Sequence, residues 1–169
     1  MIPAKRSLQG GKYVTIPEAF GVAYRVEEDG SLTELWKVSG WYSFEVFLSD
    51  DGQYLVRMGS WNVGHEPEEN DLAVAFYKKG KFLKKYSTAE LVENKSAVIA
   101  SVSHYMWLAR AKSIFDNEEK SDPEAELKLD WENIFHLKTI DGILYEFDAI
   151  TGNIKKKRSP NQPDAGDGK

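Results

Sequence analysis

Cysteine is absent from the 169 residues of the chain. Its absence excludes disulfide bonds, thiolate nucleophiles and zinc sites built from cysteine. The redox compartment stays open, because a chain without cysteine tolerates either environment. Histidine is scarce as well: His65, His104 and His136 lie far apart in the sequence. They lack the clustered spacing of a zinc site, so we predict no metal and no other cofactor.

Long apolar runs are also missing. No stretch of about 18 consecutive apolar residues occurs, so the sequence predicts no membrane insertion. The first residues, Met1 to Arg6, lack the apolar segment of a signal peptide. We therefore expect a cytoplasmic protein, or a periplasmic or secreted one if a leader has been removed. The sequence does not indicate an oligomeric state.

Common catalytic motifs are not found. There is neither a P-loop nor a dinucleotide-binding glycine loop, and no Gly-x-Ser-x-Gly elbow. Ser103 and His104 are adjacent, but neighbouring residues of a strand point to opposite faces. We therefore expect a non-catalytic binding or structural module. The alternative is a small hydrolase with an unrecognised site, because the members of a catalytic triad can lie anywhere in a sequence.

The charge balance is acidic, with 22 basic and 27 acidic residues and a net charge of -5. An acidic chain does not favour nucleic acid as a partner, since that partner requires a basic face. The one basic run is Lys155 to Arg158. We interpret it as a solvated strand end that discourages edge pairing, with a nucleic-acid-binding arm as the alternative.

Aromatic and alternating apolar residues are plentiful. Aromatic residues make up 12% of the chain and hydrophobic residues 41%, which favours strands and a real core. Alternating segments are joined by turn dipeptides such as Asp29-Gly30, Asp51-Gly52 and Asp141-Gly142. The predicted strands span 21–27, 32–38, 44–48, 54–58, 72–78, 81–87, 126–130, 134–139, 143–148 and 153–157.

These strands follow one another in hairpins without the strand–helix alternation of a parallel sheet. The sequence therefore predicts an all-β fold, an antiparallel meander arranged as a partial propeller-like stack or a sandwich. One or two short helices are expected. Ser87 to Glu90 forms a capping box, which predicts a helix reaching about Glu93. Residues 105–115 fit a strand, but they also fit helical spacing.

The ends of the chain differ from its middle. Residues 1–19 contain Gly10-Gly11 and two prolines and predict a loose arm, with at most a short strand at 13–16. Residues 20–158 are expected to form a single β domain. Residues 159–169 carry no apolar anchor and predict a disordered tail.

Two segments resemble the hairpins of β-propeller blades: FLSDDGQYLV (residues 47–56) and YEFDAITGNI (residues 145–154). Residues 40 to 155 are similar to a group of small uncharacterised bacterial proteins, several of them exported. The resemblance implies that Asp and Gly in both segments make tight turns, and it brings no catalytic residues. A closed propeller needs at least four blades of about 40 residues each, so this chain is too short to close alone.

The segment SWNVGHEPEEND (residues 60–71) is the candidate binding site. It joins two well-patterned strands and is longer than a hairpin requires, and long ordered loops are often functional. An aromatic anchor beside carboxylates suits a protein surface or a carbohydrate. The acidic part of the segment, HEPEEND (residues 65–71), lacks the regularly spaced aspartates and the glycine that a calcium site would need. The predicted binding residues are Trp61, His65, Glu66, Glu68, Glu69 and Asp71.

Overall fold

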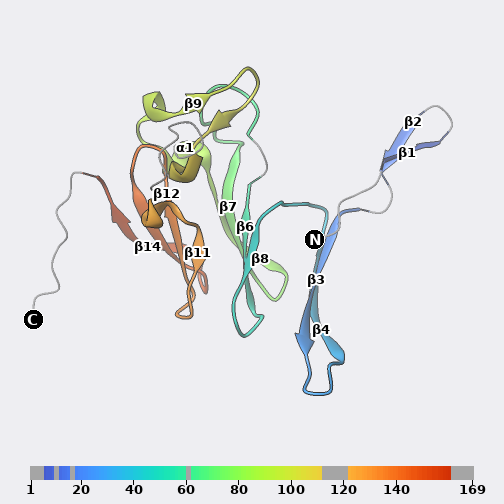
Figure 1. Ribbon diagram of the computed structural model, residues 1–169. Helices are drawn as coiled ribbons and strands as arrows, with labels where there is room; N and C mark the ends of the chain where they lie inside the picture. Colours follow the sequence, from blue (N-terminus) through green and yellow to red (C-terminus); the bar gives the residue numbers. More distant parts are fainter. Residues whose placement is uncertain (1–5, 10–11, 16–17, 60–61, 112–121, 161–169) are drawn as a thin grey trace, which may run out of the picture.

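The computed structural model describes residues 6–9, 12–15, 18–59, 62–111 and 122–160 (Figure 1). All strand pairs among these residues are antiparallel, and they form two four-stranded and three two-stranded sheets. The all-β antiparallel meander predicted from the sequence is confirmed. The expected short helices are a single turn of α-helix and three 3-10 turns in the described part of the chain.

The N-terminal strands form two separate hairpins. Strand β1 (Arg6–Gln9) pairs with β2 (Lys12–Thr15), and β3 (Phe20–Val26) pairs with β4 (Leu32–Ser39). The arm thus contains two strands where the sequence predicted at most one. Its mostly polar, glycine-interrupted sequence gives little alternation, so its pairing was missed. The predicted disorder of the tail concerns residues that lie mostly outside the described part, which ends at Pro160.

The central sheet is a four-stranded meander. Its strands are β5 (Val46–Leu48), β6 (Tyr54–Met58), β7 (Leu72–Lys78) and β8 (Lys81–Ser87), paired in chain order. Helix α1 (Thr88–Leu91) follows directly. Ser87 Oγ accepts from the Glu90 amide, and the Glu90 carboxylate accepts from the Ser87 amide, so the predicted capping box is confirmed.

A connecting region leads to the C-terminal sheet. It contains β9 (Ile99–Ala100) and β10 (Tyr105–Met106), with 3-10 turns at Lys95–Ala97, Ala109–Ala111 and Pro123–Ala125. The C-terminal sheet is a second four-stranded meander in chain order. Its strands are β11 (Lys128–Leu129), β12 (Ile134–Lys138), β13 (Leu144–Asp148) and β14 (Asn153–Arg158).

Residues 105–111 correct a prediction, because they form neither the continuous strand nor the helix that the sequence allowed. Tyr105, Trp107 and Ala109 are buried in alternation, as a strand would have them. Only Tyr105 and Met106 pair with a strand, β9, and beyond them Leu108 forms an isolated bridge with Thr139. Trp107 O accepts from the Ile140 amide at 2.7 Å, in a turn. Side-chain burial therefore imitates a continuous strand that the main chain of these residues does not form. Residues 112–115 lie outside the described part of the chain.

The larger hydrophobic core lies between the central and C-terminal sheets. Phe76 of β7 is fully buried there, and its ring centroid lies 5.3 Å from Phe147 and 6.4 Å from Phe135. A smaller core fills the other side of the central sheet, where Trp36 of β4 packs with Leu55 and Tyr77. The central sheet is thus covered on both faces, and the β3–β4 hairpin, central sheet and C-terminal sheet form three layers (Figure 1).

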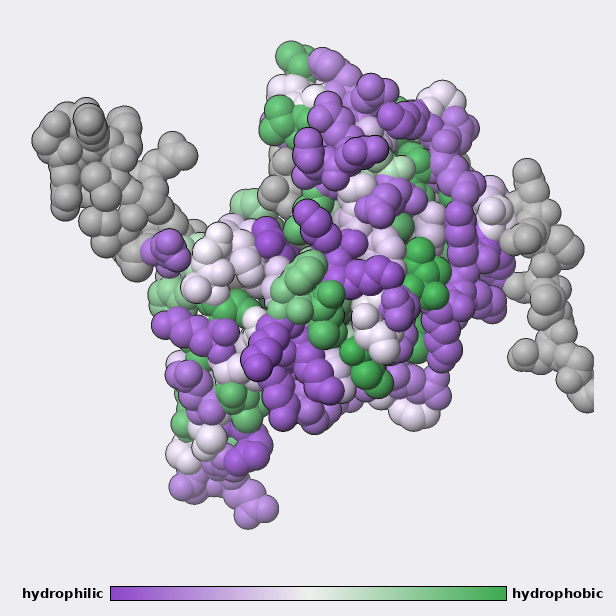
Figure 2. All heavy atoms as spheres, turned by 180° about the vertical axis from the view of Figure 1, so that it is seen from behind, coloured by the Kyte–Doolittle hydropathy of each residue, from purple (hydrophilic) through white to green (hydrophobic). Residues whose placement is uncertain are grey.

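The two outermost faces of this stack differ in character. The outer side of the β3–β4 hairpin exposes Tyr24 and Val26. The outer face of the C-terminal sheet is charged and carries Lys128, His136 and Glu146 among others. From behind, the molecule is largely hydrophilic, and hydrophobic residues form small separate patches (Figure 2).

Candidate functional site

The β6–β7 loop, predicted as the binding site, is fixed to the connecting region by its main chain. Val63 forms a bridge with His104, and the Gly64 amide donates to Ser103 O at 3.0 Å. The Tyr105 amide donates to Asn62 O at 3.3 Å. Pro67 is fully buried beneath the loop. These bonds hold residues 62–71 as an ordered surface at one end of the molecule.

The predicted binding residues fall into three groups. The side chains of His65, Glu66, Glu68 and Glu69 are exposed on this loop, and Glu66 lies 3.7 Å from Lys95 Nζ. Asp71 is only half-exposed and has the structural role described next. Trp61 lies outside the described residues. The structure therefore presents four of the six residues together on one loop, and their role in binding stays a prediction.

Asp71 anchors the loop from within. The Tyr105 hydroxyl donates to Asp71 Oδ2 at 2.6 Å and lies 2.6 Å from Thr88 Oγ1. Burial, together with the hydrogen bond to Asp71, raises the pKa of Tyr105 well above its ordinary value. The Thr88 amide also donates to Asp71 O at 2.9 Å. Asp71 thus ties the loop to α1 and β10.

The side chains of Ser103 and His104, which raised the possibility of hydrolysis, are in contact. Ser103 Oγ lies 2.8 Å from His104 Nδ1, in a bend on the surface rather than in a cleft. The His104 carbonyl accepts from Ser101 Oγ at 2.9 Å and from the Ser101 amide at 2.7 Å. This arrangement closes the turn between β9 and β10, which is a sufficient reason for the contact.

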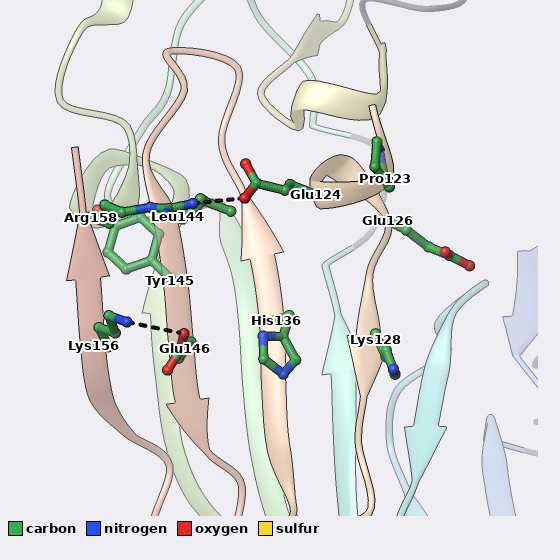
Figure 3. A pocket seen from close by; sticks show the side chains of 10 residues that line it. All are labelled: Pro123, Glu124, Glu126, Lys128, His136, Leu144, Tyr145, Glu146, Lys156 and Arg158. Carbon is green, nitrogen blue, oxygen red and sulfur yellow. Dashed lines mark hydrogen bonds and ion pairs between the residues drawn. The ribbon is translucent and has the colours of Figure 1, made fainter. Parts of the chain in front are cut away.

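A groove lies on the outer face of the C-terminal sheet. It has a volume of about 410 Å³. Strand pairing places four polar side chains in register across it, from β11 to β14 (Figure 3). The row reads Lys128, His136, Glu146 and Lys156. The 3-10 turn at Pro123–Ala125 stands over one end of the groove and adds Glu124 to its lining.

Ion pairs hold that overhanging turn against the sheet. Arg158 Nη2 donates to Glu124 Oε1 at 2.7 Å, and Lys138 Nζ donates to Asp122 Oδ2 at 2.7 Å. The hydrogen bond from Lys138 lowers the pKa of Asp122. Burial opposes the charge on Lys138, but the bonds to Asp122 and Glu124 outweigh it and raise its pKa. The groove is therefore built on rigid strands and braced at its rim.

His136 sits at the centre of the row with an acidic partner. Its Nε2 lies 2.9 Å from Asp130 Oδ2. Burial would raise the pKa of Asp130, but bonds from His136 and from the amides of Ile134 and Glu132 lower it below its ordinary value. Asp130 thereby also caps the β11–β12 turn. Among the described lining residues there is no serine or threonine that His136 could activate.

Sequence reasoning missed this groove, although part of its signal was present. In the predicted strand 134–139, His136 alternates with the apolar residues Phe135 and Leu137, which predicts that it faces outward. The register that aligns His136 with Glu146 follows from the tight Asp141-Gly142 turn. The overhang of Pro123–Ala125 has no such local signal, because it depends on ion pairs across the fold.

Comparison of the chain with protein-family models, with curated proteins and with solved structures found no match. Among the described residues, no group of three or more histidine, aspartate or glutamate side chains is placed to hold a metal ion. No described helix has the length and apolar character needed to span a membrane. The geometry of the loop and the groove is therefore the basis for a proposed function.

Proposed function

We propose that this protein is a non-catalytic binding module, built from propeller-like hairpins, that recognises a polar segment of another protein. The observation that carries the proposal is the charged row across the groove of the C-terminal sheet. Its side chains project from adjacent strands in register, so their spacing is set by the sheet. Rigid elements of this kind position binding groups more accurately than mobile loops do.

The lining of the groove favours a protein over a carbohydrate. Sugars are commonly held by stacking on exposed aromatic rings. The one aromatic residue of the described lining, Tyr145, is 1% exposed, and its hydroxyl donates to Leu91 O at 2.8 Å. The groove instead presents two lysines and a glutamate in fixed positions on the sheet, and such a pattern favours a partner whose charged groups are of opposite sign at matching positions.

The same lining argues against the alternative of a small hydrolase. His136 and Asp130 are paired as in a catalytic site, yet no serine or threonine of the described lining accompanies them, and the chain has no cysteine. A nucleophile within reach of its base is the first requirement of covalent hydrolysis. Asp130 has a structural role, because it caps the β11–β12 turn, and this role is sufficient to explain its contact with His136.

Affinity capture from the native host, read by mass spectrometry, tests the proposal. Lys128→Glu/Lys156→Glu should lose the captured partner, whereas Arg25→Glu/Lys37→Glu, on the β3–β4 hairpin, has the same net charge and should retain it. Circular dichroism confirms that each variant is folded. Equal capture by the groove pair and the wild type would contradict the role of the groove.

The loop prediction is tested in the same experiment. Trp61→Ala and Glu68→Ala/Glu69→Ala should reduce capture if residues 60–71 are a second contact surface. Unchanged capture would make the loop a connector only. Turnover of ester, phosphate or glycoside substrates by the purified wild type, abolished by His136→Ala, would overturn the non-catalytic assignment.

A further inference from the structure

Basic residues are strongly segregated in this acidic chain. Residues 72–89 and 149–160 contain no aspartate or glutamate. Together they hold nine of the 22 lysines and arginines: Lys78, Lys79, Lys81, Lys84, Lys85, Lys155, Lys156, Lys157 and Arg158. All 27 acidic residues lie elsewhere in the sequence. The net charge of -5 therefore conceals two wholly basic segments.

The fold brings these two segments together. They form β8 and β14, the last strands of the central and C-terminal sheets, and each is paired on one side only. Tyr86 of β8 donates its hydroxyl hydrogen to Gly152 O at 3.0 Å, and Lys84 Nζ donates to Asn153 Oδ1 at 2.8 Å. We call the surface formed by residues 78–85 and 150–157 the basic rim.

Part of this charge is not compensated. Lys156 and Lys157 have acidic partners in Glu146 and Glu93. For Lys79, Lys81, Lys85 and Lys155, no carboxylate of the described residues lies within 4.0 Å, and all four side chains are exposed. These lysines create a positive potential that a partner can use.

Apolar side chains stand exposed between the lysines. Phe82 is 56% exposed, Ile150 42%, Ile154 38% and Leu83 36%. Protection of an open edge from pairing explains lysines on these strands, but it does not explain exposed phenylalanine, leucine and isoleucine beside them. Large apolar groups next to uncompensated lysines are the combination that binds at a lipid interface.

We propose that the basic rim docks on an anionic lipid bilayer. Its lysines lie against acidic headgroups, and Phe82, Leu83 and Ile154 enter the boundary between headgroups and acyl chains. Nucleic acid fits less well, because arginine and stacked aromatics dominate such sites. The rim contains no arginine, since Arg158 lies just beyond it and is bonded to Glu124, and the rim has one exposed ring, Phe82. The proposal is independent of the groove and of the partner that it binds.

Sedimentation with vesicles tests this surface. The full chain should pellet with phosphatidylcholine vesicles that contain phosphatidylserine, and not with phosphatidylcholine alone. Each lysine near an anionic leaflet contributes about fivefold in affinity. Lys81→Glu/Lys85→Glu/Lys155→Glu should therefore weaken binding by at least about a hundredfold. Binding by the wild type should also fall as salt is added, because the charges are exposed.

Two further variants decide what the binding depends on. Lys37→Glu/Lys95→Glu/Lys128→Glu changes the net charge equally but leaves the rim intact, so it should bind vesicles nearly as the wild type does. Phe82→Ser retains every charge and should weaken vesicle binding. The part of the binding that persists at high salt should be smaller than in the wild type, because that part comes from apolar contact. The proposal is overturned if the wild type ignores phosphatidylserine, if the control triple loses binding equally, or if only a single-stranded oligonucleotide is bound.

Discussion

Arg110 and Glu45 form a bidentate ion pair on the surface of the molecule. They lie 65 residues apart in sequence, and the guanidinium grips the carboxylate with two parallel bonds, one of which spans 2.7 Å from Nη1 to Oε1. The contact fastens the 3-10 turn at Ala109–Ala111 to the residues that lead into β5. The hydrogen bond from Arg110 lowers the pKa of Glu45, although burial opposes the shift.

This contact should make the free energy of unfolding decrease as the pH is lowered. A carboxyl group with a lowered pKa stabilises the fold above its unfolded pKa, and the effect disappears as the pH falls through the folded value. Because the pair is partly exposed, Glu45→Gln should cost about 0.5–1 kcal/mol near neutral pH. Urea titrations near pH 7 and near pH 3 should show the difference from the wild type shrinking in acid. A difference of equal size at both values would contradict this account.

Local polar contacts could be predicted from the sequence, and distant ones could not. Asp51 Oδ1 accepts from the Gln53 amide at 2.9 Å, and Asp148 Oδ1 accepts from the Ile150 amide at 3.0 Å. Both are local turn interactions of the kind that aspartate and glycine in these two segments predict. Glu45 and Arg110 give no such signal, because only the completed fold makes them neighbours.

The β13–β14 turn shows how one element is seated on another. Gly152 has a φ of +74°, and a Cβ atom placed on it would lie 2.8 Å from Lys84 Cβ and 3.2 Å from Phe76 Cβ. The turn is therefore pressed against β7 and β8 of the central sheet. Gly30, in the β3–β4 turn, has a similar φ of +81° but open space around it.

This pair of glycines separates backbone strain from crowding. Gly30→Ala should cost about 1 kcal/mol through backbone strain alone. Gly152→Ala should cost about 1–3 kcal/mol more, because the methyl group collides with side chains that are already packed. Equilibrium denaturation of both variants measures the difference. Equal losses would show that the turn is not pressed against β8.

Hairpins were predictable at this scale, but the connections between sheets were not. Turn dipeptides and alternation located the strands of both meanders to within about two residues, which is the usual accuracy. The prediction for residues 105–111 was wrong because their side chains are buried in alternation, whereas beyond Met106 the main chain has only isolated contacts and a 3-10 turn. The groove could not be predicted for a related reason. One of its walls is the Pro123–Ala125 turn, and the position of that turn depends on contacts across the sheet.

At the scale of the whole molecule, the sequence suggested the layered arrangement without fixing it. Strand β7 is apolar on both sides, with Val74 and Phe76 in the larger core and Ala75 and Tyr77 in the smaller one, which is typical of a sheet buried on both faces. Which sheet covers which face could not be deduced, because alternation carries no partner information. The resemblance to propeller blades stays a prediction.

Removing the terminal residues tests whether they contribute to the stability of the fold. We expect a chain lacking residues 1–10 and 159–169 to keep its melting temperature within a few degrees, because both cores lie between residues 23 and 149. Differential scanning calorimetry measures the change. A fall of more than about ten degrees would show that the terminal segments contribute to the folded core.

The order of layers along the chain has a consequence for synthesis on the ribosome. When Ser87 has emerged, the central sheet can pair its strands, but the side of Val56, Val74 and Phe76 that meets the C-terminal sheet is still uncovered. About 60 more residues must be translated before β13 is complete, which takes about 3–12 s at ordinary elongation rates. During that interval the nascent chain presents an apolar sheet to the cell, and this is when a chaperone would be needed most.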